Sequence, residues 1–154
     1  MANADLVNAD AILSRLPATS QAALFAAVAA RGERLTGVAS EVILRGLAGR
    51  EALGTTGFGG GVALPYVRLE SVSHPVALFA RMEKPIEYGA LDGVPVDLVY
   101  CLFSPPEGSA EHLKALARAS RALRDPGLTA RLRGAADAAS IHALLAAPPL
   151  ARAA

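Results

Sequence analysis

The sequence has no tryptophan, a single cysteine and almost no excess of charge of either sign. The lone Cys101 excludes an internal disulfide, and because it lies in an apolar run we expect a small buried side chain there. The net charge of +1 and the absence of any long basic run argue against nucleic-acid binding. No apolar run approaches the roughly 20 residues that cross a bilayer, and the first ten residues do not resemble a signal peptide. We therefore expect a cytoplasmic protein with no membrane insertion.

What the chain has instead is apolar side chains, which make up 53% of its 154 residues, against 19% charged residues. That length and composition predict one compact domain with a real core. Three scattered histidines show no metal-ligand spacing, so we expect neither a metal nor a cofactor. We assign the domain to residues 1–147 and predict a flexible C-terminal tail over residues 148–154.

Hydrophobic periodicity predicts helices interleaved with short strands, which is typical of an α/β fold. The expected strands are Val62–Tyr66, Pro75–Arg81 and Val94–Phe103. The expected helices are one capped by Ser20 and stopped by Gly32, one from Ser40 to Glu51, one capped by Ser109, and two short ones over Leu128–Arg133 and Ala138–Leu145, the last capped by Asp137. For the helix after Ser109, the spacing places the apolar face on Leu113, Leu116, Ala117, Ser120 and Leu123.

The least ordinary stretch is Gly54–Gly61, which has too much glycine for an ordinary helix or strand. Glycine lets backbone N–H groups approach an anion, and Arg50 and two threonines stand close by in sequence. The stretch lacks the Gly-Lys-Ser/Thr end of a nucleotide P-loop, and it runs from a helix into a strand, unlike a dinucleotide-binding loop. The candidate anion-binding set is Arg50, Thr55, Thr56, Gly57, Gly59 and Gly61. A tight turn with no ligand is the alternative that the glycine content leaves open.

Residues 50–66 read Arg-Glu-Ala-Leu-Gly-Thr-Thr-Gly-Phe-Gly-Gly-Gly-Val-Ala-Leu-Pro-Tyr. This resembles the signature of the enzyme IIA domains of the bacterial phosphotransferase system, of the fructose, mannitol and nitrogen-regulatory type. That signature is approximately Arg-Glu-x-Leu-Gly-Ser-Thr-Gly-Ile-Gly-x-Gly-Ile-Ala-Ile-Pro-His. The resemblance continues, in matching order along the chain, with Lys84-Pro85-Ile86, residues 92–99 and Glu111-His112-Leu113.

The resemblance implies a single domain with a central mixed β-sheet flanked by helices. It also implies a phosphoryl group accepted on the histidine after Ile-Pro, from a small histidine-phosphorylated carrier protein of the HPr or NPr kind. Transport members pass the group to a sugar permease component. Nitrogen-regulatory members instead regulate partner proteins, such as transporters and sensor kinases, by binding them in a phosphorylation-dependent way.

The sequence departs from the family pattern at Tyr66, which stands where the acceptor histidine is expected. A phenol has an ordinary pKa of about 10, so it is a poor nucleophile at neutral pH without a base. A phosphotyrosine ester is also a weaker phosphoryl donor than phosphohistidine. We therefore predict that the protein does not run the ordinary relay and is not a competent phosphotransferase of the usual kind. The departures at Val67 and Gly60 suggest further drift of the site.

His112 matches the family's second active-site histidine, so the resemblance places it beside Tyr66, where a Tyr–His hydrogen bond is the natural contact. Three interpretations of Tyr66 stay open: a phosphorylation-dead site that still binds partners, a permanent copy of the unphosphorylated state, or a true acceptor with His112 as its base. Phe58 is either an exposed interface anchor or a loop side chain tucked onto the core.

The leading hypothesis is a regulatory binding protein of the nitrogen-regulatory enzyme IIA type. One alternative is an active phosphoryl carrier that uses Tyr66 or His112. Another is a domain that binds a small molecule or nucleotide through Gly54–Gly61. A hydrolase has less support, because the Gly-x-Ser-x-Gly elbow is absent.

Overall fold

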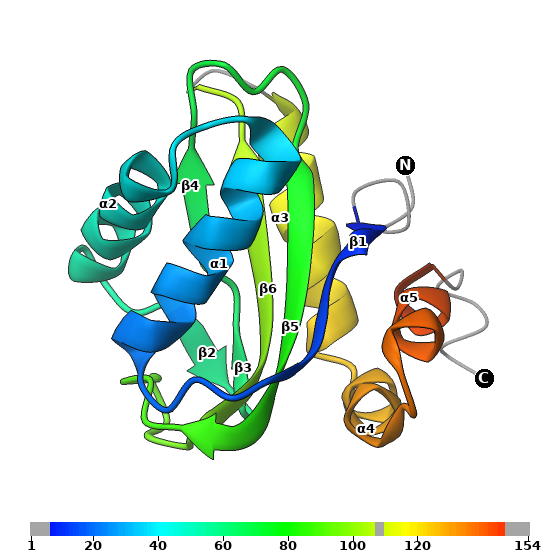
Figure 1. Ribbon diagram of the computed structural model, residues 1–154. Helices are drawn as coiled ribbons and strands as arrows, with labels where there is room; N and C mark the ends of the chain where they lie inside the picture. Colours follow the sequence, from blue (N-terminus) through cyan, green and yellow to red (C-terminus); the bar gives the residue numbers. More distant parts are fainter. Residues whose placement is uncertain (1–6, 107–109, 147–154) are drawn as a thin grey trace.

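The computed structural model describes residues 7–106 and 110–146, which form one mixed six-stranded sheet with helices on both faces (Figure 1). The strands are β1 (Val7–Leu16), β2 (Gly57–Gly59), β3 (Val62–Ala63), β4 (Tyr66–Arg68), β5 (Val76–Ile86) and β6 (Val96–Ser104). The helices in these ranges are α1 (Gln21–Thr36), α2 (Ser40–Ala52), α3 (Ala110–Leu123), α4 (Pro126–Gly134) and α5 (Ala138–Ala146). None of them is long and apolar enough to cross a membrane.

Strand β6 is the centre of the sheet. It pairs antiparallel with β5 on one side and parallel with both β3 and β4 on the other. The outer strands are β1, parallel to β5, and β2, antiparallel to β3. Nearly every residue of β6 is buried, as its continuous apolar run predicts for a strand covered on both faces. Cys101 lies in this strand, fully buried as expected, and burial raises the pKa of its thiol.

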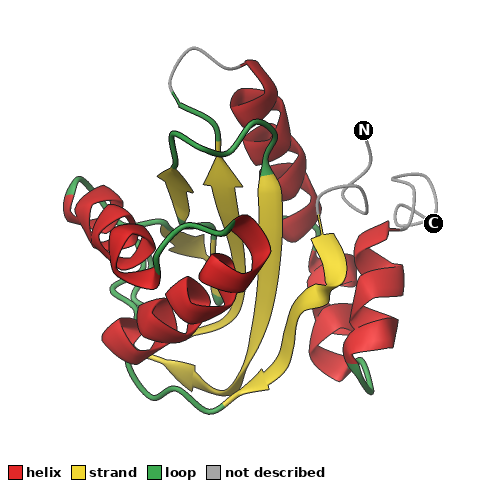
Figure 2. Ribbon diagram, turned by 45° about the horizontal axis from the view of Figure 1, so that its top comes forward, coloured by secondary structure: helices red, strands yellow, loops and turns green. Residues whose placement is uncertain are grey.

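Two helical layers cover the sheet, α1 and α2 on one face and α3, α4 and α5 on the other (Figures 1 and 2). Each layer closes its own apolar core. The core under α1 and α2 is built around Phe25, Ile43 and Phe103. The core under α3 to α5 is built around Phe79 and Tyr100. This arrangement confirms the predicted α/β class with a mixed central sheet flanked by helices.

The helix starts are predicted well, and one helix end is predicted wrongly. The Ser20 side chain caps α1 by accepting a hydrogen bond from the Ala23 N–H at 3.1 Å, and Asp137 caps α5 through the Ser140 N–H at 2.8 Å. Gly32 does not stop α1, which continues to Thr36 and ends at Gly37 with a φ of 80°. Glycine is needed at position 32 because α1 packs closely against β6 there, and a Cβ would lie 2.8 Å from the Phe103 ring.

Helix α3 is rotated relative to the prediction. Leu113, expected on the apolar face, is 64% exposed, while His112 is buried. The buried side of α3 consists of His112, Ala115, Ala119, Ala122 and Leu123. The small alanines let the helix approach the sheet closely. Asp125-Pro126-Gly127 begins α4 rather than only ending α3, since the Asp125 carboxylate accepts from the Gly127 N–H at 2.9 Å. The proposed Ser109 cap and the tail over residues 148–154 lie outside the described residues.

Three features of the sheet were not predicted. Strand β1 has no alternating pattern, because Asn8, Ala9 and Asp10 are all exposed, and its register along β5 is broken. Strand β5 extends to Ile86, and Pro85 is tolerated because it falls where the ladder to β6 is interrupted. The expected strand Val62–Tyr66 is divided into β3 and β4 by Leu64 and Pro65.

Candidate functional site

Tyr66 and His112 meet at the carboxyl end of β6. Tyr66 begins β4 and pairs with Leu102, while His112 lies in the first turn of α3. Their ring centroids are 4.7 Å apart, and the rings are inclined by 57°. The predicted proximity of the two residues is therefore confirmed. The expected Tyr–His hydrogen bond is not found within the described residues. The two rings instead pack against each other in a tilted arrangement.

The imidazole of His112 is bonded to Ser104 instead. Its Nδ1 lies 2.6 Å from the hydroxyl oxygen of Ser104, the last residue of β6, and both side chains are buried. Burial lowers the pKa of His112, and the positive charge of Arg68 lowers it further. The neutral ring is thus the form that this environment favours at neutral pH. With Nδ1 engaged, Nε2 is the nitrogen left to exchange a proton with a neighbour.

Arg50 completes this group from the end of α2. Its guanidinium carbon lies 5.2 Å from the centroid of the Tyr66 ring, in cation–π range. Its Nη1 also donates to the Gly54 carbonyl at 2.8 Å, which fixes the guanidinium at the helix end. The ends of α2 and β6 and the starts of β4 and α3 therefore bring together three of the predicted site residues: Arg50, Tyr66 and His112.

Thr56 is occupied within the protein. Its hydroxyl donates to Glu51 Oε1 at 2.5 Å and lies 2.7 Å from the Tyr88 hydroxyl, and its N–H donates to both Glu51 oxygens. Burial raises the pKa of Tyr88, so this phenol stays protonated. Sequence reasoning did not identify Glu51 and Tyr88 as partners of this loop. The hydrogen bonds from Thr56 to Glu51 hold the end of α2 against the glycine stretch.

The glycine stretch folds into a hairpin, so the expectation that it holds no strand is wrong. The first residue of β2, Gly57, has no room for a side chain, because a Cβ there would lie 2.8 Å from the Ala90 Cβ and 2.9 Å from the Tyr88 ring. The N–H of Gly57 donates to the Thr55 hydroxyl at 3.0 Å. The turn between β2 and β3 consists of Gly60 and Gly61, and both residues, like Gly59 at the end of β2, have positive φ.

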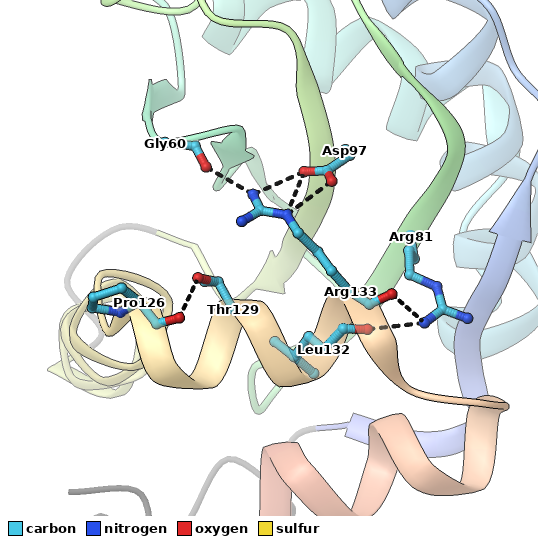
Figure 3. A network of polar contacts seen from close by, with 7 residues as sticks. All are labelled: Gly60, Arg81, Asp97, Pro126, Thr129, Leu132 and Arg133. Atoms are coloured by element: carbon cyan, nitrogen blue, oxygen red, sulfur yellow. Dashed lines mark hydrogen bonds and ion pairs between the residues drawn. The ribbon is translucent and has the colours of Figure 1, made fainter.

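The hairpin turn is held by two carboxylates and an arginine, of which Figure 3 shows Asp97 and Arg133. The Gly60 N–H donates to Asp92 at 3.0 Å, and its carbonyl accepts from Arg133 Nη2 at 2.7 Å. Arg133 is in turn paired with Asp97, at 2.8 Å from Nε to Oδ2. The amides of Thr56, Gly57 and Gly60 thus already have oxygen partners. An anion-binding role for Thr55, Thr56, Gly57, Gly59 and Gly61 stays a prediction, and no hydrogen bond in the described part of the chain joins them to Tyr66.

Arg81 is a second organising residue that the sequence did not single out. It donates to the carbonyls of Ser14 at 2.9 Å, Leu132 at 2.9 Å and Ala135 at 2.7 Å. It thereby joins β1, β5 and the end of α4, as Figure 3 shows in part. With Arg15 and Arg133 it lines a cavity of about 340 Å³ at the opposite end of the sheet from Tyr66. The only feature of the sequence that points to this role of Arg81 is its position at the end of an apolar run of strand residues.

Phe58 combines the two interpretations that the sequence left open. It is half-buried and packs against the core under α3. The guanidinium carbon of Arg124, just after α3, lies 4.7 Å from its ring centroid. Part of the ring is therefore core, and the rest lies under an arginine at the surface.

Comparisons with known proteins agree with this geometry. The family model described as phosphoenolpyruvate-dependent sugar phosphotransferase system, EIIA 2, matches residues 5–147. A nitrogen regulatory protein of Bradyrhizobium diazoefficiens is 43% identical over 145 residues, which cover 94% of this chain and 95% of the relative. A nitrogen regulatory protein of Pseudomonas aeruginosa is 35% identical, over 69% of each chain.

Solved structures give the same result. The crystal structure of nitrogen regulatory protein IIA-Ntr from Neisseria meningitidis superposes with a TM-score of 0.87 at 27% identity, covering 92% of this chain and 97% of that one. IIA mannitol from Escherichia coli, at 20% identity, shares the fold with a TM-score of 0.74, covering 90% of this chain and 98% of that one. The chain therefore belongs to the EIIA type 2 family of the phosphoenolpyruvate-dependent sugar phosphotransferase system and is similar to its nitrogen regulatory proteins.

Proposed function

We propose that the protein is a nitrogen-regulatory enzyme IIA-like module that acts by binding other proteins and does not carry phosphate in the usual way. The observation that carries this proposal is the contact between Tyr66 and His112, 4.7 Å between ring centroids. By the resemblance over residues 50–66, Tyr66 corresponds to the family's acceptor position and His112 to its second histidine. The contact between the two side chains supports the proposal that they form one site, with a phenol in the acceptor's place.

The chemistry of the phenol supports a regulatory role. A neutral imidazole attacks a phosphoryl donor directly and holds the group as a labile phosphoramidate. A protonated phenol needs a base, and its phosphate ester is too stable to pass the group onward. Arg50 lies over the ring rather than over an open anion site. The protein thus offers partners one constant surface at Tyr66, where histidine-bearing relatives switch between two states.

The partners that we propose are the histidine-phosphorylated carrier protein of the HPr or NPr kind and regulatory targets such as transporters and sensor kinases, met in the cytoplasm. The docking surface is the face around Tyr66. Leu53, 86% exposed after α2, and Leu113, 64% exposed in the first turn of α3, are the apolar side chains that a partner would cover. Half-exposed Phe58 lies on the same side of the sheet as Tyr66.

The test is intact-mass spectrometry after incubation with phosphoenolpyruvate, enzyme I and the carrier protein, for the wild type and for Tyr66→His. We expect the wild type to stay unmodified and the variant to gain one phosphoryl group. That result means that the fold still docks the carrier and that only the acceptor is missing. If neither protein is modified and neither binds the carrier, the docking part of the proposal is wrong.

A second candidate function has one observation in its favour, because the His112 ring lies against Tyr66, where a general base would stand, and burial lowers the pKa of His112, which favours the neutral ring. In that case the wild type itself gains phosphate in the same experiment. An acid-stable adduct would assign it to Tyr66, and an acid-labile adduct to His112. A thermal-shift screen with nucleotides and phosphosugars tests the remaining alternative, since a ligand in excess of its Kd raises the melting temperature.

A further inference from the structure

A polar cavity lies at the opposite end of the sheet from Tyr66. Its volume of about 340 Å³ is in the range of about 300–1,000 Å³ that small-molecule sites occupy. Its charged lining consists of three arginines and two acids: Arg15, Arg81, Arg133, Glu83 and Asp97. This excess of positive charge disfavours a cation in the cavity and favours an anion. Tyr66 and His112 do not line the cavity, so it is separate from the candidate site.

Arg81 is the arginine of this cavity whose charge no acid balances. Its Nε and Nη1 atoms donate to the carbonyls of Ser14, Leu132 and Ala135, at 2.7 to 2.9 Å. Figure 3 shows the guanidinium held against the end of α4. Within the described residues, no carboxylate lies at ion-pair distance from it, and its Nη2 atom makes no hydrogen bond. The carbonyls orient the guanidinium but leave its positive charge, which is what the carboxylate or phosphate group of a ligand would meet.

Arg15 can join Arg81 at little cost. Its Nη2 atom pairs with Glu83 at 3.0 Å, but the Arg15 side chain is 75% exposed and the Glu83 side chain 36%. An ion pair this exposed to water is weak, so Arg15 can exchange Glu83 for a ligand anion. Arg15 also directly follows Ser14, whose carbonyl accepts from Arg81. The end of β1 therefore connects the fixed arginine with the movable one.

Arg133 forms the wall of the cavity on the side of the glycine hairpin. It donates to both Asp97 oxygens and to the Gly60 carbonyl (Figure 3). The Arg133 and Asp97 side chains are only 35% and 22% exposed, so this pair is firmer than that of Arg15 with Glu83. We expect it to stay intact when a ligand binds. Arg81 and Arg15 are then the two side chains that hold the anion.

We propose that this cavity binds a small anion that carries a carboxylate or phosphate group. Arg81 is the fixed anchor, and Arg15 turns from Glu83 to the bound group. Planar guanidinium groups match the geometry of carboxylate and phosphate oxygens, and such charge-assisted hydrogen bonds are strong. Met82 and Pro85 also line the cavity and offer apolar surface to a short carbon body. The inference goes beyond the proposed function and does not rest on it, because the two sites share no residue.

The test is a titration followed by amide NMR shifts, with succinate, glycerol phosphate and inorganic phosphate as probes at constant ionic strength. Arg15→Met removes the movable arginine without touching the carbonyl contacts of Arg81. Its matched control, Arg45→Met, removes the same charge from α2, on the opposite face of the sheet. Glu83→Gln releases Arg15 from its ion pair, and Glu41→Gln, also on α2, is the control for that change of charge. Melting temperatures of all variants check that they fold.

We expect saturable shifts of the amides of Ser14, Met82 and Arg133 in the wild type, with a Kd of about 5 mM or tighter. Arg15→Met should raise that Kd at least about fivefold, because a charged hydrogen-bond donor is lost. Glu83→Gln should lower it about twofold or more, since no carboxylate then competes for Arg15. Each probe preference supports an anion site and identifies its source. Tighter binding of glycerol phosphate than of inorganic phosphate indicates an organic phosphate, equal binding indicates the free ion, and a preference for succinate indicates a carboxylate.

Three results would overturn the inference. The first is the absence of saturable shifts up to about 20 mM of every probe. The second is an equal Kd for Arg15→Met and Arg45→Met, because the anion would then bind elsewhere. The third is a set of shifts centred on Arg50 and Tyr66, which would place the anion at the candidate site. All three leave the proposed function intact, since phosphoryl transfer tests that function separately.

Discussion

The imidazole of His112 is clamped between two neighbours, with its ring against Tyr66 and its Nδ1 2.6 Å from the hydroxyl of Ser104. Ser104 ends β6, Tyr66 begins β4 and His112 opens α3, so the contact joins three chain segments. The glycine hairpin is held by a different set of contacts, from Glu51, Asp92 and Arg133. The segments that resemble the family thus form two sets of contacts, one around the Tyr66–His112 pair and one around the hairpin.

The first prediction concerns pH. Burial and Arg68 lower the folded-state pKa of His112, whereas the unfolded chain keeps the ordinary value of about 6.5. Below that pH the unfolded state binds more protons than the folded state, so stability falls as pH falls. The contribution is complete above about pH 6.5 and is lost as the pH drops toward the folded-state pKa. We expect the free energy of unfolding of the wild type to decline between about pH 7.5 and 5.5.

The matched variant is His112→Asn, which can keep a polar contact to Ser104 but does not titrate in this range. Its stability should change less over the same pH interval, as measured by urea unfolding. Equal slopes for wild type and variant would show that His112 protonates as easily in the folded protein as in the unfolded chain.

The second prediction is that Ser104→Ala destabilises the fold. The change removes the hydroxyl that faces Nδ1 and leaves a buried ring nitrogen without its partner, at a cost of about 1–3 kcal/mol. Ser73→Ala is the control, because Ser73 is exposed, and it should change the free energy of unfolding by less than about 0.5 kcal/mol. Urea midpoints measure both. A Ser104→Ala midpoint equal to that of the control would mean that the bond contributes nothing net.

Much of the fold follows from local sequence signals, and the exceptions have physical causes. Ser20 and Asp137 cap helices as their residue types predict, and β6 is recognisable from its apolar run. Strand β1 is not recognisable, since it depends on pairing with β5 rather than on its own pattern. Leu113 was placed on the wrong side of α3, because small alanines rather than leucines make the close contact with the sheet.

The candidate site likewise combines contacts that the sequence predicts with contacts that it does not. Family resemblance correctly places His112 beside Tyr66, although the two residues are far apart in the chain, and the structure adds Arg50 to this pair. Sequence patterns do not reveal that Ser104 is the partner of His112 or that Arg81 joins three elements. Both contacts depend on side chains that meet only after the sheet and its helical layers are assembled.

The third prediction compares a glycine that close packing requires, Gly57, with a glycine that alanine can replace, Gly49. A Cβ at Gly57 would lie 2.8 Å from the Ala90 Cβ and 3.0 Å from the Ala90 Cα, so backbone must move. Gly57→Ala should cost about 1–3 kcal/mol through overpacking. Gly49→Ala is the control, because a Cβ there meets nothing within 4 Å and alanine is favoured in α2, by up to about 1 kcal/mol. Thermal unfolding should therefore shift in opposite directions. A stabilised Gly57→Ala would show that the hairpin is looser than its packing indicates.

The last prediction concerns Arg81, whose guanidinium donates to the carbonyls of Ser14, Leu132 and Ala135. Arg81→Met keeps the length of the aliphatic stem but leaves these oxygens without their charged donor, at a cost of about 2–3 kcal/mol. Arg15→Met is the matched control from the same cavity, because Arg15 is 75% exposed and its ion pair with Glu83 contributes less than about 1 kcal/mol. Hydrogen exchange gives a more specific readout, since amides in the last turn of α4 and in β1 should exchange faster in Arg81→Met alone. Uniform acceleration across the whole sheet would instead mean that Arg81 supports global stability and does not hold these two elements in particular.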